Sequence, residues 1–105
     1  MRSILEREKL SGTNFIDWYQ NLRIVLKQEK KEYVLEQPYP DEPADTTTTA
    51  KRRAYEKHYN DSLDVSCVML ATMKSELQKQ YELSDAHNMV TGLHIMFENQ
   101  VRVER

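Results

Sequence analysis

The side chains best suited to chemistry in this sequence are one cysteine, Cys67, and three histidines, His58, His87 and His94. Nucleophilic catalysis needs a nucleophile, a base and a group that orients the base, all within hydrogen-bonding reach. His58 and Cys67 are nine residues apart in one predicted helical region. At ~1.5 Å per residue they lie roughly 13 Å apart, too far for a hydrogen bond. We therefore predict no catalytic residues, with His58 on the surface and Cys67 a buried structural cysteine.

A metal site would need more ligands than the spacing provides. His94 and Glu98 stand at i and i+4, but His87 is about 10 Å from His94 along the same predicted helix, so the two histidines cannot share an ion. The single cysteine excludes an internal disulfide and every multi-cysteine zinc motif. The only glycines, Gly12 and Gly92, form no phosphate-binding loop. We predict no metal and no cofactor.

Two basic runs, Lys30-Lys31 and Lys51-Arg52-Arg53, could attract nucleic acid. Glu29 and Glu32 flank the first and Glu56 follows the second, so both fields are weakened. Fifteen Lys and Arg stand against seventeen Asp and Glu, a net charge of −2, which gives no global attraction to nucleic acid or an anionic membrane. No apolar run approaches the ~20 residues of a membrane span, and the N-terminus does not resemble a secretory signal. We expect a cytoplasmic, intracellular domain that does not itself bind nucleic acid.

The elements around these residues predict one all-α domain over 1–105, a compact bundle of four to five helices. A helix is predicted from Phe15 to about Lys30, capped by Thr13 or Asn14. Its core-facing stripe recurs at helical spacing and consists of Phe15, Trp18, Leu22, Val25 and Leu26. An N-terminal segment, 1–12, precedes it, and a proline-rich acidic loop, 36–46, follows.

A second helical region is predicted from about Ala50 to Met73, with a possible break at Asn60-Asp61. It is apolar on all faces from Ser62 to Met73, which predicts a buried centre of the domain. Ser75 and Gln78 resemble a capping box for a short helix through about Glu82. Ser84-Asp85 is expected to cap a last helix, whose apolar stripe is Ala86, Met89, Val90, Leu93, Met96, Phe97 and Val101.

Two isoleucines stand outside these stripes. Ile24 lies nearly opposite the first stripe, among polar neighbours, and Ile95 points away from the last one. An apolar residue on a polar face indicates a partner, although isolated exposed apolar residues are also common. Ile24 and Ile95 are therefore the candidate protein-interface residues.

The stretch Lys9-Leu10-Ser11-Gly12-Thr13-Asn14-Phe15-Ile16-Asp17-Trp18 resembles the opening of plant copia-type Gag polyproteins. The resemblance continues through 21–26, 36–40, 54–58, 70–77 and 86–97, nearly the whole chain. It implies the retroviral-capsid-like N-terminal domain of an LTR retrotransposon Gag. Such a domain self-assembles through weak contacts with other copies and with the downstream Gag region, and so forms virus-like particles around the element's RNA.

Two departures from the family pattern bear on that implication. Tyr55 stands where related domains often carry tryptophan, which we interpret as a tolerated core aromatic. The family's RNA-binding zinc knuckle lies downstream, and this sequence stops at Arg105, which indicates a fragment or a truncated or domesticated copy. Two alternatives therefore stay open. One is a host protein-interaction module descended from Gag, which genomic context would reveal; the other is a small RNA-binding helical protein, which a salt-dependent RNA shift would reveal.

Overall fold

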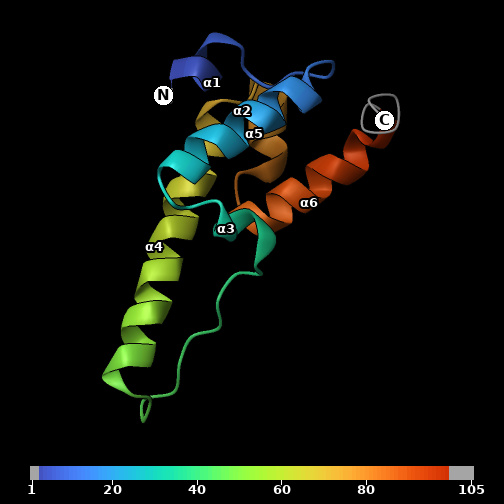
Figure 1. Cartoon of the computed structure of the whole chain (residues 1–105). Helices are drawn as coiled ribbons and strands as arrows, with labels where there is room; N and C mark the ends of the chain where they lie inside the picture. Colours follow the sequence, from blue (N-terminus) through green and yellow to red (C-terminus); the bar gives the residue numbers. More distant parts are fainter. Residues whose placement is uncertain (1–2, 100–105) are drawn as a thin grey trace.

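In the computed structural model, which describes residues 3–99, six helices follow one another along the chain (Figure 1). They are α1 (Ser3–Arg7), α2 (Phe15–Gln28), α3 (Tyr33–Glu36), α4 (Thr49–Ala71), α5 (Ser75–Tyr81) and α6 (Ala86–Met96). Within these described residues there is no strand, only an isolated parallel bridge between Leu10 and Met73. The predicted all-α class is confirmed, because four of the helices have seven residues or more.

The predicted stripe of α2 is its buried face: Phe15, Trp18, Leu22, Val25 and Leu26 are all buried. Asn14 is the N-cap residue, as expected, but its side chain does not cap the helix. Its Oδ1 accepts from the Ser11 amide at 2.8 Å and its Nδ2 donates to the Lys9 carbonyl at 3.0 Å. The amide side chain is thus used to close the preceding turn. The helix ends two residues before Lys30, whose φ of 61° is left-handed.

The short helix α3 was not predicted. Its Val34 and Leu35 are buried, and tertiary packing rather than length stabilises this single turn. The segment that follows, residues 37–48, contains no helix, as its prolines predict. It runs alongside the first half of α4 (Figure 1).

Helix α4 is continuous through Asn60 and Asp61, so the predicted break is wrong. The Asp61 carboxylate is bound by Lys57 one turn earlier and by Tyr33, and so does not compete for the helix backbone. The first turn is capped by Thr48, whose hydroxyl accepts from the Lys51 amide.

Residues 62–73 are not buried on all faces, which corrects a second prediction. Val65, Val68, Met69 and Met73 are buried, whereas Leu63 and Cys67 are exposed. The reason is that α4 packs against α3, α5 and α6, and these helices leave one side of it exposed to solvent.

The last two helices are joined closely. Asp85 caps α6 by accepting from the Asn88 amide, as predicted. The capping box at Ser75 is absent, because Lys74 is the N-cap residue and Gln78 Nε2 instead donates to the Leu70 carbonyl at 2.7 Å. A Cβ at Gly92 would lie 2.9 Å from Tyr81 Oη, so glycine permits the close approach of these elements.

The predicted stripe of α6 is only partly correct. Ala86, Met89, Val90 and Leu93 are buried, but Met96 is exposed. Phe97 packs at the edge of the core, and Val101 lies outside the described residues.

The core is formed by buried apolar side chains of α2, the second half of α4 and α6, to which α1, α3 and α5 add a few more. Trp18, Leu22 and Val25 are buried there as predicted, whereas Leu70 and Phe97 are partly buried at its edge. Trp18 Nε1 donates to Thr72 Oγ1 at 3.2 Å, so the largest core side chain has its polar atom satisfied. The first half of α4 extends away from the other helices (Figure 1), and the molecule measures 48 × 28 × 26 Å.

Candidate functional site

Ile24 lies on the exposed side of α2, with 51% of its surface accessible. Gln20, Arg23, Lys27 and Glu32 surround it and line a shallow depression of about 410 Å³. Arg23 Nε donates to Glu32 Oε2 at 2.8 Å, so an ion pair forms one wall of this depression. The prediction that Ile24 faces away from the core is confirmed.

Ile95 is 71% exposed on α6 and does not line the depression beside Ile24. Its neighbours in sequence pack inward: the His94 ring contacts Phe15 at 5.2 Å and Tyr19 at 4.7 Å between centroids, and Phe97 stacks on Phe15 at 5.3 Å. The helix therefore presents its aromatic residues to α2 and Ile95 to solvent. Both isoleucines are exposed as predicted, on different helices; their role in an interface stays a prediction.

A larger apolar groove was not predicted. It lies between one side of α4 and the turn 82–85, has a volume of about 440 Å³, and includes Tyr39 in its lining. Leu63 is 53% exposed and Leu83 is 97% exposed. The other lining residues are Tyr59, Ser62, Ser66, Cys67, Leu70, Glu82, Ser84 and Asp85. The lining thus combines apolar side chains with the carboxylates of Glu82 and Asp85, and among residues 3–99 it includes no Lys or Arg.

The sequence carries only a partial signal for this groove. Tyr59, Leu63 and Leu70 are spaced by four and seven residues and so lie on one side of α4. The interpretation of residues 62–73 as buried on every side concealed it.

The residues considered for catalysis and metal binding are not brought together. His58 and Cys67 lie on the uninterrupted helix α4, so their separation of roughly 13 Å at ~1.5 Å per residue holds. Cys67 is exposed, not buried as predicted, because α4 is uncovered on that side. His58 is half-buried with its ring 5.2 Å from that of Tyr33. Among residues 3–99, no group of three or more His, Cys, Asp or Glu side chains could hold a metal ion.

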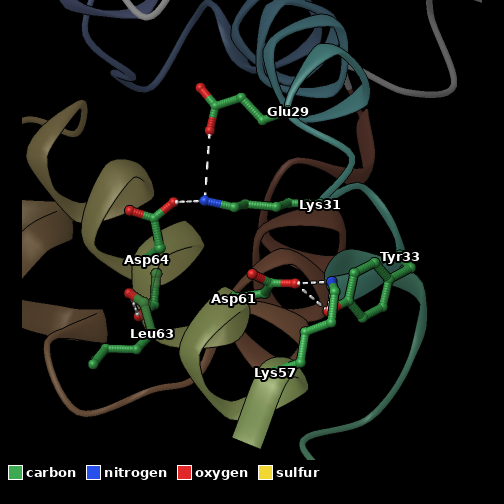
Figure 2. Close-up of polar contacts among 8 residues, drawn as sticks. Glu29, Lys31, Tyr33, Lys57, Asp61, Leu63 and Asp64 are labelled. Carbon is green, nitrogen blue, oxygen red and sulfur yellow. Dashed lines mark hydrogen bonds and ion pairs between the residues drawn. The ribbon is translucent and has the colours of Figure 1, made fainter. Parts of the chain in front are cut away.

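Polar contacts tie α4 to the segment between α2 and α3 (Figure 2). Lys31 Nζ lies 2.7 Å from Asp64 Oδ2 and 3.9 Å from Glu29 Oε1. Tyr33 donates to Asp61, and Lys57 Nζ donates to the same carboxylate at 2.7 Å. Two of the basic side chains are therefore held in intramolecular ion pairs.

The cluster of Tyr33, Lys57 and Asp61 shifts the titration of its members. Burial raises the pKa of Asp61, but the hydrogen bonds from Lys57 and Tyr33 outweigh it and lower the pKa overall. Burial, together with the hydrogen bond to Asp61, raises the pKa of Tyr33. The cluster thus favours a charged carboxylate beside a neutral phenol, an arrangement that holds α3 against α4.

The run Lys51-Arg52-Arg53 is exposed at the extending end of α4. Arg52 Nη2 donates to the Ala44 carbonyl at 3.3 Å. None of the helices within residues 3–99 has both the length and the apolar character needed to cross a membrane.

The fold and surface define an all-α domain with several exposed apolar side chains. Comparison of the chain with protein-family models, curated proteins and solved structures gave no match. The resemblance to copia-type Gag therefore depends on the sequence segments quoted above.

Proposed function

We propose that this chain is a non-catalytic self-assembly domain of a copia-type retrotransposon Gag protein, which forms virus-like particles with other copies and with the downstream Gag region. The observation that carries the proposal is the exposure of Ile24 and Ile95, 51% and 71%, on two different helices of a domain with a well-packed core. A domain with two separate contact surfaces can bind two neighbours, which an extended assembly requires.

Two of the segments that carry the resemblance contact each other in the folded chain. Leu10 belongs to the opening segment and Thr72 to a later one, and the Leu10 amide donates to the Thr72 carbonyl at 2.7 Å. The Lys74 amide donates back to the Leu10 carbonyl at 3.0 Å, and Trp18 binds the Thr72 hydroxyl. Residues distant in sequence but quoted for the same resemblance therefore depend on one another for packing.

Each of the proposed contacts is expected to be weak when it acts alone. Each isoleucine offers one apolar side chain, and a contact of that size is too small to hold a stable dimer alone. Many such contacts repeated across a particle give a stable assembly through their number. At micromolar concentration the isolated domain is accordingly expected to be a monomer or to associate weakly.

The test is to change Ile24→Asp and Ile95→Asp, both in the isolated domain and in a full-length Gag. Because neither side chain faces the core, the isolated domain should keep its circular dichroism spectrum and unfolding midpoint. Particles of the full-length protein should be lost, since a charge at a desolvated contact is costly. Sedimentation and electron microscopy measure the particles.

Gln80→Asp is the matched control, because it adds the same charge at an exposed polar position of α5. It should leave particles intact. Particles that persist with both isoleucines changed would remove these residues from the interface. Loss of the fold in the isolated domain would instead place them in the core.

A further inference from the structure

We infer that a hollow between α4 and the proline-rich loop binds an alkylammonium cation, the head group of a lysine side chain that carries one or two N-methyl groups on a partner protein. The inference does not depend on the self-assembly proposed above, because neither Ile24 nor Ile95 lines this hollow.

The hollow lies on the first half of α4 and has a volume of about 440 Å³. Four of its lining residues belong to the helix: Tyr55, Glu56, Tyr59 and Asn60. Positions 55 and 59, and positions 56 and 60, are one turn apart, so the four side chains project from one side of α4. The fifth lining residue, Glu42, belongs to the segment that runs alongside this half of the helix (Figure 1). The hollow is therefore bounded by helix and loop together.

Two tyrosine rings give the hollow an aromatic surface. The rings of Tyr55 and Tyr59 lie 6.1 Å apart between centroids and are tilted by 35°. Tyr39 packs edge-on against Tyr59, at 6.0 Å and 74°, and so favours one orientation of that ring. The face of an aromatic ring attracts a cation, and alkylammonium groups are typical ligands of such surfaces.

Two carboxylates in the same lining supply negative charge. Glu42 and Glu56 are both exposed, and no ion pair within residues 3–99 includes either of them. Among these described residues, no Lys or Arg lines the hollow. The lining therefore offers two carboxylates to a cation from another molecule.

The neighbouring basic side chains of α4 are bound at other positions. Arg52 Nη2 donates to the Ala44 carbonyl at 3.3 Å. Lys57 Nζ donates to the Asp61 carboxylate at 2.7 Å. The contacts that fasten the loop and α3 to the helix thus direct both cations away from the hollow.

The combination of rings and carboxylates selects the form of the cation. An unmodified lysine ammonium is strongly hydrated, which opposes its transfer onto ring faces. N-methyl groups weaken that hydration and add apolar surface that packs on Tyr55 and Tyr59. A trimethylated nitrogen has no N–H to donate, whereas a mono- or dimethylated nitrogen keeps one or two for the carboxylates of Glu42 and Glu56. The lining therefore fits a lysine with one or two methyl groups best.

NMR titration of the full chain with small probes tests the site. The probes are the Nα-acetyl amides of dimethyl-lysine, of unmodified lysine and of norleucine, whose side chain has no cationic head. Dimethyl-lysine should shift the ring resonances of Tyr55 and Tyr59 with a Kd on the order of 1 mM, and its N-methyl protons should move upfield. Unmodified lysine should bind about fivefold more weakly, and norleucine should not bind.

Variants separate the charge from the rings. Glu42→Gln with Glu56→Gln removes both charges while keeping the side-chain shapes, and should weaken dimethyl-lysine binding about tenfold. Tyr55→Leu with Tyr59→Leu removes the ring faces and should weaken it to a similar extent, whereas Tyr55→Phe with Tyr59→Phe keeps the faces and should retain binding. None of these four residues belongs to the core, so the circular dichroism spectrum should be unchanged.

Glu6→Gln with Glu76→Gln is the matched control, because it removes the same charge from exposed positions of α1 and α5. It should leave binding unchanged, and an equal loss in this control would reduce the site to general charge attraction. Three further results would overturn the inference. They are unshifted Tyr55 and Tyr59 resonances at about 20 mM dimethyl-lysine, equal binding of norleucine, and wild-type affinity in the folded leucine variant. Equal binding of unmodified lysine would refute the preference for methyl groups.

Discussion

The two halves of α4 belong to different environments. Its second half, residues 62–71, packs against the other helices and contributes Val65, Val68 and Met69 to the core. Its first half, residues 49–61, contributes no residue to the core and is flanked by the proline-rich loop (Figure 1). We call residues 37–61 the arm and the rest of the described chain the body.

The difference shows that the two halves of one helix can be stabilised by different interactions. In the body, stability comes from burial of apolar surface. In the arm it comes from local interactions, including the Thr48 cap and the i, i+4 pair of Lys57 and Asp61, which are individually weak. Substitutions in the body should therefore have larger effects on unfolding than those in the arm.

The largest effect is expected for Trp18→Ala. The change removes a buried indole and should cost roughly 3–5 kcal/mol. Small domains have only ~5–15 kcal/mol in total, so the variant should be close to unfolding. Urea denaturation followed by circular dichroism measures it, because Trp18 is the only tryptophan and its fluorescence is lost.

Tyr59→Ala is the matched aromatic change in the arm. Tyr59 is exposed, and its ring lies 6.0 Å from that of Tyr39 and 6.1 Å from that of Tyr55 between centroids. Its removal should cost about 1 kcal/mol or less. Equal costs for the two substitutions would show that body and arm are not distinct.

An effect smaller than that of Trp18→Ala is expected for Thr72→Val. The methyl group fills the space of the hydroxyl, but Trp18 Nε1 loses its acceptor in the core. A buried donor left without a partner costs about 1–3 kcal/mol. Thr72→Ser keeps the hydroxyl and should retain most of the stability. Wild-type unfolding of Thr72→Val would show that water or another group satisfies the indole.

The sequence predicted the buried stripes of the long helices better than the short helix α3 and the start of α5. The stripe from Phe15 to Leu26 was predicted because a single helical period marks all its members. Helix α3 was missed because a four-residue helix before Pro38 carries no periodic signal. The predicted capping box at Ser75 was wrong because the Gln78 side chain donates to the Leu70 carbonyl instead, a contact that forms only in the folded chain.

The same limit applies to the surfaces. Ile24 and Ile95 could be predicted as exposed because each lies opposite a stripe on its own helix. The groove required the turn 82–85 to be placed beside α4, which no local pattern encodes. Leu63 and Cys67 were predicted as buried because an apolar pattern does not say which faces of a helix are covered by neighbours.

Asp61, which binds Tyr33 of the body and Lys57 of the arm, should make the free energy of unfolding depend on pH in acid. The pKa of Asp61 is lowered in the folded state, so its contribution to stability is complete above the unfolded pKa of ~3.9 and is lost as pH falls through the lower folded value. Asp61→Asn should cost about 0.5–1.5 kcal/mol at neutral pH. It should also remove part of the acid-induced loss of stability below about pH 4. An unchanged acid profile would exclude Asp61 as its source.

The smallest effect, confined to mildly acidic pH, is expected at His94 in the body. Burial lowers the pKa of His94 from its usual value of 6.5, so the unfolded state binds the proton more readily than the folded one. The free energy of unfolding should therefore decrease as pH falls below about 6.5, and level off below the folded pKa. His94→Phe keeps a ring edge against Phe15 and Tyr19 but cannot titrate, and should abolish this decrease while leaving stability at pH 8 nearly unchanged. His87→Phe, on the same helix, is the control and should retain the decrease. Chemical denaturation at intervals between pH 5 and pH 8 separates this body effect from that of Asp61, which begins at lower pH. If the decrease persists in the His94 variant, another group causes it. The packing of His94 against α2 would then have no part in the response to acid.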